Sequence, residues 1–316
     1  MNNMKNFRTI VLSVLAVLLS CGNLRAADGP KAPLDSKVIV AYVTSWSHVI
    51  PDPKYMTHIN YAFGHVSETF DGVGIANESR LKQMVELKKQ NPDLKVLLSI
   101  GGWGSGRFSE MAANEKYRKS FAKDCRRVVK EYGLDGIDID WEFPQEEEWD
   151  SFSLLLVQLK QLLSSQPQPI ALSVALYPQQ NQMNTEAMQA LDRIHLMAYD
   201  QFDRQGFHST LQTAQEAVEQ LLQQGADARQ LSLGIPAYGR PLDASAQWVF
   251  YKDIPQDISR ENPDLDGEIF FNSAATAAAK TQFACDSKLG GVMLYHLLCD
   301  RTGPDSLVAA CRSAID

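Results

Sequence analysis

Residues 134–144 read Leu134-Asp135-Gly136-Ile137-Asp138-Ile139-Asp140-Trp141-Glu142-Phe143-Pro144. Four carboxylates fall within eight residues of a segment whose other side chains are suited to burial. Because side chains alternate between the two faces of a β-strand, this pattern predicts a strand that directs Asp138, Asp140 and Glu142 to one face. The two isoleucines and the tryptophan between them take the other face.

Three neighbouring carboxyl groups on one buried face cannot all ionise, because each negative charge disfavours the next. At least one of their pKa values must rise, and a carboxyl group with a raised pKa is suited to general acid catalysis. A solvated acidic edge strand would explain the acids without catalysis, but the apolar residues between them argue against it. We therefore predict a catalytic site on this strand, with Glu142 as its general acid.

The rest of the chain alternates short β-branched stretches with amphipathic helical patterns. Eight strands are predicted, at residues 38–46, 59–66, 96–101, 136–143, 170–177, 194–199, 231–238 and 291–297. This alternation predicts an α/β fold, a (β/α)8 TIM barrel that forms a single catalytic domain over residues 37–316. A doubly wound open sheet is the alternative.

Two connections depart from the regular pattern. Residues 47–57 are too short and too interrupted by proline to form the first helix. Residues 241–271 are predicted to be a polar connection, too short for a large α+β insertion. The loops at the C-terminal ends of barrel strands carry function, so both segments are candidates to border a ligand cleft.

The N-terminus has the features of an export signal. Lys5 and Arg8 precede an apolar run at 10–19 that is too short to span a bilayer comfortably. The run ends in Leu18-Leu19-Ser20-Cys21-Gly22, which resembles the lipobox of bacterial lipoproteins. We expect residues 1–20 to be a signal peptide, Cys21 to be lipidated, and 21–36 to be a linker that anchors an exported domain at the periplasmic or cell-surface side of a membrane. Cleavage near Ala26 and secretion is the alternative.

Composition limits the partners. The 316-residue chain has a net charge of −8 and no continuous basic stripe, which argues against nucleic-acid binding. Its six histidines lack metal-like spacing, so we expect no metal and no cofactor. The remaining cysteines show no C-x-x-C pair, and their disulfide pairing stays open: Cys125, Cys285, Cys299 and Cys311. We expect a monomer.

The acidic strand resembles the family 18 glycoside hydrolases, the chitinase family. Asp135, Asp138, Asp140 and Glu142 match the D-x-x-D-x-D-x-E signature of that family. The stretch 99–102 resembles the S-x-G-G element of its third strand, and 197–200 the M-x-Y-D element of its sixth. The resemblance implies a retaining mechanism in which the N-acetyl oxygen of the sugar attacks the anomeric carbon and forms an oxazolinium intermediate.

The resemblance also implies roles for individual residues. Glu142 would protonate the glycosidic oxygen and later activate water, and Asp140 would hydrogen-bond the acetamido N–H. Asp138 would exchange a proton with Asp140. Tyr199 would donate its hydroxyl to the acetamido carbonyl, and Asp200 would contact the sugar beside the scissile bond.

A second set of residues is expected to surround these groups. The resemblance implies that Tyr42 and Ser99 hydrogen-bond the inner acid, Asp138, and Asp135 is expected to lie behind the acids with them. Aromatic rings near strand ends are candidate sugar platforms, although core packing explains each equally well: Trp46, Trp103, Trp141, Tyr238, Tyr295 and Trp248. Arg240 is expected to hold a loop or a sugar hydroxyl. Tyr295 stands where many family members have a tryptophan, which puts chain-length preference in doubt.

The resemblance implies that the substrate is chitin or an oligosaccharide containing N-acetylglucosamine. Without an α+β insertion, the cleft should be shallow and suit mid-chain attack or short oligosaccharides. One alternative is an endo-β-N-acetylglucosaminidase that cuts the chitobiose core of N-glycans. Another is a non-enzymatic lectin, against which the presence of Glu142 argues.

Overall fold

The computed structural model describes residues 38–256 and 261–316. The predicted signal peptide at 1–20, the lipid attachment site Cys21 and the linker at 21–36 lie outside the described residues. Within the described ranges, no helix is both long and apolar enough to cross a bilayer.

Eight parallel strands form a closed ring. They are β1 (Val38–Thr44), β2 (His58–Val66), β4 (Lys95–Gly101), β5 (Gly136–Asp140), β6 (Ala171–Leu176), β7 (Arg193–Leu196), β8 (Leu231–Pro236) and β13 (Gly291–Tyr295). Their order is β1-β13-β8-β7-β6-β5-β4-β2, and a parallel pairing of β1 with β2 closes the barrel. The predicted (β/α)8 barrel is confirmed, and the open-sheet alternative is wrong because the β1–β2 pairing leaves no free edge.

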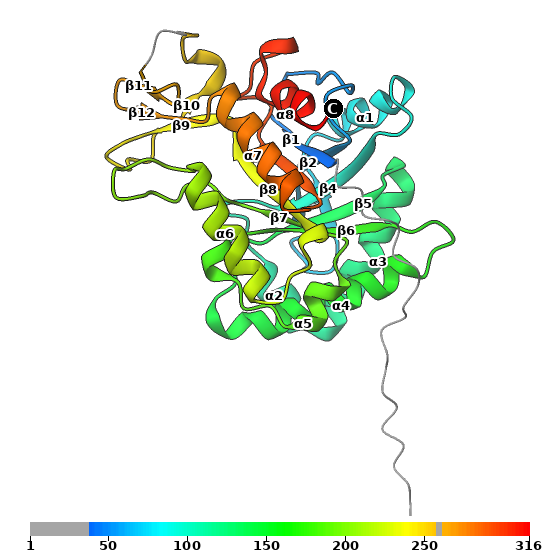
Figure 1. Cartoon of the computed structure of the whole chain (residues 1–316). Helices are drawn as coiled ribbons and strands as arrows, with labels where there is room; N and C mark the ends of the chain where they lie inside the picture. The colour runs from blue at the N-terminus through cyan, green and yellow to red at the C-terminus, as the bar shows by residue number, and fades with distance from the viewer. Residues whose placement is uncertain (1–37, 257–260) are drawn as a thin grey trace, which may run out of the picture. The chain divides into compact units, whose positions relative to one another are not determined.

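Helices surround the barrel strands in Figure 1. They are α1 (Glu78–Glu86), α2 (Phe108–Ala113), α3 (Glu115–Tyr132), α4 (Trp149–Ser164), α5 (Thr185–Ala190), α6 (Leu211–Gln223), α7 (Ala274–Asp286) and α8 (Leu307–Ile315). In α4 the buried leucines recur every three or four residues, so one side of the helix packs on the barrel. As predicted, no helix separates β1 from β2.

The segment after β8 differs from the predicted irregular connection. It forms a small antiparallel sheet in the order β10-β9-β12-β11, built from β9 (Tyr238–Pro241), β10 (Val249–Phe250), β11 (Leu265–Asp266) and β12 (Ile269–Phe270). The apolar residues of β10 and β12 each pair with β9. These strands are too short to give a clear period-two pattern in the sequence. The described part of this segment contains no α-helix, in agreement with the expected absence of a large α+β insertion.

The barrel separates two apolar clusters. The larger one lies between strands and helices and contains Ile137, Ile139 and Trp141. The smaller one contains Tyr42 and Tyr199. The alternation predicted for residues 137–142 is thus confirmed, since the apolar residues of β5 join the outer cluster while the acids face away from it.

Candidate active site

Asp138 is fully buried on β5 and accepts three hydrogen bonds from three other strands of the barrel. Tyr42 Oη and Ser99 Oγ donate to Oδ2 over 2.7 and 2.8 Å. Ser173 Oγ donates to Oδ1 over 2.6 Å, and His195 Nε2 lies 3.7 Å from the same oxygen. These contacts satisfy both oxygens of a buried carboxylate, which would otherwise be costly to hold in the barrel.

The structure brings Tyr42 and Ser99 to Asp138, where the sequence placed them, but Ser173 and His195 were missed. Ser173 follows from strand register, because Ser99 and Ser173 lie level with Asp138 on the two adjacent strands, whereas His195 comes from β7, the strand beyond β6. A serine within the apolar β6 was the available signal. Burial lowers the pKa of His195 to about 4, so its ring is neutral at Asp138.

Asp140 is the next acid on the same face and is almost completely buried. Its Oδ1 has no hydrogen-bond partner in the described part of the chain. Burial, followed by the negative charges of Glu142 and Asp138, holds the pKa of Asp140 well above its ordinary value. An uncharged Asp140 can share its proton with a neighbouring carboxyl group.

Glu142 lies two residues beyond the end of β5. Burial first, and then the charge of Asp200, raise the pKa of Glu142 to about 7. Hydrogen bonds from Asp140 and from the backbone N–H of Trp103 act in the opposite direction. The result is a carboxyl group that can still donate a proton near neutral pH, beside a second carboxyl group whose pKa is also raised.

Asp200 follows β7 in a left-handed conformation, with φ of 56°. Tyr238 Oη donates to its Oδ2 over 2.7 Å, and Arg240 Nη1 donates to its Oδ1. Tyr199 lies immediately before it and stacks on Tyr295, with ring centroids 6.1 Å apart at 22°. The ends of β7, β9 and β13 therefore meet beside the acids.

The β4 glycines let the backbone approach the acid strand. Gly102 N–H donates to the carbonyl oxygen of Asp140 over 2.8 Å. A Cβ on Gly101 would lie 1.9 Å from the same oxygen, and Gly101 also has φ of +129°. Only glycine fits there without displacing Asp140.

An aromatic cleft of about 690 Å³ opens next to these acids. It is lined by Trp46, Phe63, His65, the loop 101–107, Trp248, Tyr295 and His296. Trp103 and Trp46 are 81% and 59% exposed, which is unusual for tryptophan and typical of ligand platforms. The cleft belongs to the acid site, because Trp103 also reaches Glu142 through its backbone and Tyr295 stacks on Tyr199.

Two candidate platforms do not present a free face. Tyr238 is buried under Trp248, with ring centroids 3.8 Å apart at 4°, so its only polar contribution is the hydroxyl on Asp200. Trp141 packs in the outer core against Phe108, with centroids 5.3 Å apart at 14°. Neither ring can therefore stack on a sugar, and Trp248, which is partly buried, lines the cleft in place of Tyr238.

Asp135 is a further correction. Its carboxylate lies just before β5, where it accepts the Val96 N–H over 2.7 Å and pairs with Lys88 at 2.5 Å. This is the opposite end of the strand from Glu142, so Asp135 cannot support the acids. It joins β4 to β5 and holds the strand start in register.

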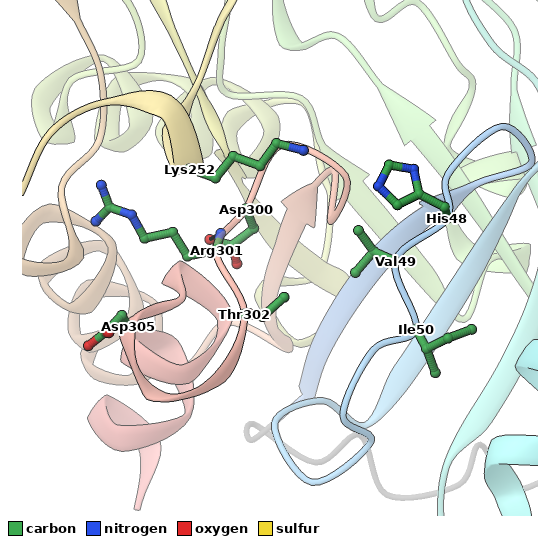
Figure 2. Close-up of a pocket in the computed structure, with 8 residues that line it drawn as sticks. All are labelled: His48, Val49, Ile50, Lys252, Asp300, Arg301, Thr302 and Asp305. Carbon is green, nitrogen blue, oxygen red and sulfur yellow. Dashed lines mark hydrogen bonds between the residues drawn. The ribbon is translucent and has the colours of Figure 1, made fainter.

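A second pocket, of about 540 Å³, lies between the loop after β1 and the segment after β13 (Figure 2). It is lined by His48, Val49, Ile50, Lys252, Asp300, Arg301, Thr302 and Asp305. Lys252 Nζ donates to the Leu298 carbonyl over 2.7 Å, and Asp300 accepts the N–H groups of Leu307 and Val308. Two of its charged groups thus already serve the fold, and none of the barrel acids reaches it.

The described residues contain no cluster of three or more side chains suited to hold a metal ion. Cys125, Cys299 and Cys311 are thiols, and burial raises the pKa of Cys299 and Cys311 to about 12. Thiols with raised pKa values are poor nucleophiles, so they pack as small apolar groups.

Comparison with known proteins agrees with this geometry. The family model of glycosyl hydrolases family 18 matches residues 38–300. The chain is 28% identical to probable chitinase 2 of Drosophila melanogaster over 73% of its own length and 56% of that protein. It is also 28% identical to chitinase 1 of Aphanocladium album, over 82% of its length and 74% of that protein.

A solved structure shares the same fold. The family 18 chitinase ChiB from the chitin utilization locus of Flavobacterium johnsoniae superposes with a TM-score of 0.77 at 23% identity, covering 88% of this chain and 94% of that one. Fold, acid row and family model together define the class of protein: a (β/α)8 barrel with a carboxylate site at the end of its fourth barrel strand. The chain belongs to glycosyl hydrolase family 18.

Proposed function

We propose that this protein is a chitinase-type glycosidase that hydrolyses β-1,4 bonds between N-acetylglucosamine units. The observation that carries the proposal is the row of Asp138, Asp140 and Glu142 at the end of β5, with Glu142, whose pKa burial raises to about 7, beside an open aromatic cleft. Chitinases among its relatives support the substrate class. The chain spans only 56% of the Drosophila relative.

The first chemical step uses the proton on Glu142. As the bond from the anomeric carbon to the leaving oxygen breaks, Glu142 gives its proton to that oxygen. The carbonyl oxygen of the substrate's N-acetyl group forms the new bond to the anomeric carbon and gives an oxazolinium ion. The unpaired Oδ1 of Asp140 is a free acceptor for the acetamido N–H, which stabilises the developing positive charge.

The second step regenerates the enzyme. Glu142, now ionised, takes a proton from water, and the oxygen of that water opens the oxazolinium ring with retention of configuration. Tyr199 orients the acetamido carbonyl in both steps. Asp138, fixed by three hydroxyl groups, exchanges a proton with Asp140 as the charge on Glu142 changes.

The cleft favours short or internal segments of the polymer. Its walls are the loop 101–107, the ends of β2 and β13, and the aromatic side chains Trp46 and Trp248, and the described part of the segment after β8 adds no α-helix. We expect attack on soluble oligosaccharides or within chains, because nothing in the described walls encloses a threaded polymer.

Substrate comparison tests the proposal. We would incubate the domain with methylumbelliferyl glycosides of chitobiose and chitotriose, with the corresponding cello-oligosaccharide glycosides, and with an N-glycan. Release from the chitin glycosides alone supports the proposal, since the cello-oligosaccharides lack the N-acetyl group. Cleavage of the N-glycan alone would favour an endo-β-N-acetylglucosaminidase, and sugar binding without any turnover would favour a lectin.

We also propose that the protein is an exported lipoprotein attached through Cys21, and that it acts as a monomer. The lipobox-like sequence before Cys21 supports the anchor. Expression of the full chain beside Cys21→Ser, followed by membrane fractionation, tests it. The anchor requires that Cys21→Ser moves the protein from the membrane to the soluble fraction, and an unchanged distribution would contradict it.

A further inference from the structure

Lys280 is a charged side chain in α7 that is completely buried. Its Nζ donates to three neutral acceptors: the Ser209 carbonyl at 2.6 Å, the Ser209 Oγ at 2.8 Å and the Asn272 Oδ1 at 2.7 Å. Among the described residues, no carboxylate forms an ion pair with it. Burying an ammonium group without an ion partner costs free energy, which these three hydrogen bonds must offset.

Ser209 in turn hydrogen-bonds the backbone on both sides of the residues Tyr199 and Asp200. Its Oγ donates to the carbonyl of Ala198, immediately before Tyr199, over 2.8 Å. Its N–H donates to the carbonyl of Gln201, immediately after Asp200, over 3.2 Å. A single residue therefore fixes the peptide groups that flank both site residues.

The same segment adopts a backbone that needs such support. Asp200 and Ser209 are both left-handed, with φ of 56° and 54°. Residues other than glycine rarely adopt this conformation, and it persists where the surroundings enforce it. Asn272 adds to this by donating Nδ2 to the Ser209 carbonyl over 2.9 Å.

We propose that Lys280, acting through Ser209, is the positioning residue that sets Tyr199 and Asp200 against the acids. Lys280 touches no substrate in this account. The cluster of Lys280, Ser209 and Asn272 joins α7 and the chain just after β12 to the loop after β7, which carries Tyr199 and Asp200. This inference rests on the proposed function for the role of Tyr199.

The burial of Lys280 also makes the cluster sensitive to its protonation. Burial lowers the pKa of Lys280 to about 7, against the charge of Asp264, which acts in the opposite direction. A neutral amine has two donors for three acceptors, and the Ser209 hydroxyl is already donating to Ala198. The cluster is therefore complete only with the ammonium form.

Lys280→Met tests the inference because it keeps the length of the side chain and removes its donors. We expect kcat on methylumbelliferyl chitobioside to fall at least tenfold while KM changes less than about threefold, since misplacing catalytic groups by an ångström costs rate. Deuterium exchange should accelerate at the amides of residues 198–210. Ser209→Ala, which is a smaller change, should reproduce both effects if Lys280→Met does not fold.

Thr281→Val is the matched control. Thr281 is equally buried on the next position of α7, and its Oγ1 donates to the Ala277 carbonyl within the helix. It should lower the melting temperature without changing kcat or the exchange of 198–210. The inference is overturned if Thr281→Val lowers kcat as much as Lys280→Met, or if exchange at 198–210 stays unchanged in Lys280→Met and Ser209→Ala. Absence of any wild-type turnover would instead count against the proposed function, and the exchange experiment would still decide the role of Lys280.

Discussion

Asp138, Asp140 and Glu142 share one face of one strand, yet their surroundings give them different properties. Three hydroxyl groups stabilise Asp138 as an acceptor. Asp140 is buried between two acids, and Glu142 is buried with Asp200 nearby, so both have raised pKa values. Different environments for identical groups are how one site supplies both a proton donor and a charge stabiliser.

The pH dependence of the reaction follows from the proton on Glu142. Since the pKa of Glu142 is about 7, kcat/KM should fall as pH rises beyond that value and the acid form is lost. Asp200→Asn removes a charge that raises this pKa, so the alkaline limb should move to lower pH. A pH–rate profile of both proteins measures the shift, and an alkaline limb that moves upward or stays in place would refute this source of the raised pKa.

Replacing Glu142 should change stability in the opposite sense to activity. Its pKa is raised from 4.5 to about 7 by folding, so its native form binds a proton more tightly than the unfolded chain does. Its contribution to the free energy of unfolding is therefore fully present below pH 4.5 and is lost as pH rises through 7. Glu142→Gln should gain roughly 3 kcal/mol over the wild type between pH 4.5 and pH 8.

Urea denaturation of both proteins at the two pH values measures this difference. An equal difference in the free energy of unfolding between wild type and Glu142→Gln at both pH values would show that burial does not raise the pKa of Glu142. Because the same variant should lose activity while it gains stability at pH 8, the two measurements separate catalytic loss from misfolding.

At the residue scale, the sequence predicts what lies on one strand better than what other strands add. Alternation places Asp138, Asp140 and Glu142 on one face, and the structure agrees. Asp135 fits the same motif, but it precedes β5 and so lies at the other end of the strand from Glu142, where it contacts Val96 and Lys88. Ser173 and His195 reach Asp138 from other strands, and although a serine within the apolar β6 was a signal, only the register shows that it meets Asp138.

At the scale of elements, β4 and β5 must approach closely for the site to form. Gly101 sits where any Cβ would collide with the Asp140 carbonyl, and the backbone is also left-handed there. Gly101→Ala should therefore lower stability by more than about 3 kcal/mol and abolish activity with it.

Gly106→Ala is the corresponding control. Gly106 lies in the same loop, and a Cβ there would meet nothing within 4 Å. Its melting temperature should remain within 2 °C or so of wild type, because a surface substitution without clashes changes stability little. Thermal unfolding of both variants checks the contrast, and equal losses would show that the loop rather than the Asp140 contact sets the cost.

Element prediction failed where the strands are shortest. The eight barrel strands have buried apolar runs that the sequence shows directly, whereas β10, β11 and β12 have two residues each. These short strands form because they pair with residues elsewhere in the chain. Phe250 pairs with Tyr238, and Phe270 pairs with Arg240. The register, not the local pattern, makes them strands.

At the scale of the domain, closure of the barrel is what gathers the site. Residues from β1, β4, β5, β6 and β7 meet at Asp138, which no open arrangement of the same strands would achieve. The number and alternation of strands predicted this closure. The cleft depends on loops and on the small sheet after β8, and their paths depend on contacts that the sequence does not reveal.

The central claim is that Glu142 is the acid of a working glycosidase. The most direct test is release of methylumbelliferone from the chitotriose glycoside by wild type and Glu142→Gln, with chitotriose binding to each protein measured by calorimetry. The account predicts turnover by the wild type, a loss of at least a thousandfold in kcat for Glu142→Gln, and similar binding by both. Turnover by Glu142→Gln within about tenfold of the wild type would contradict it.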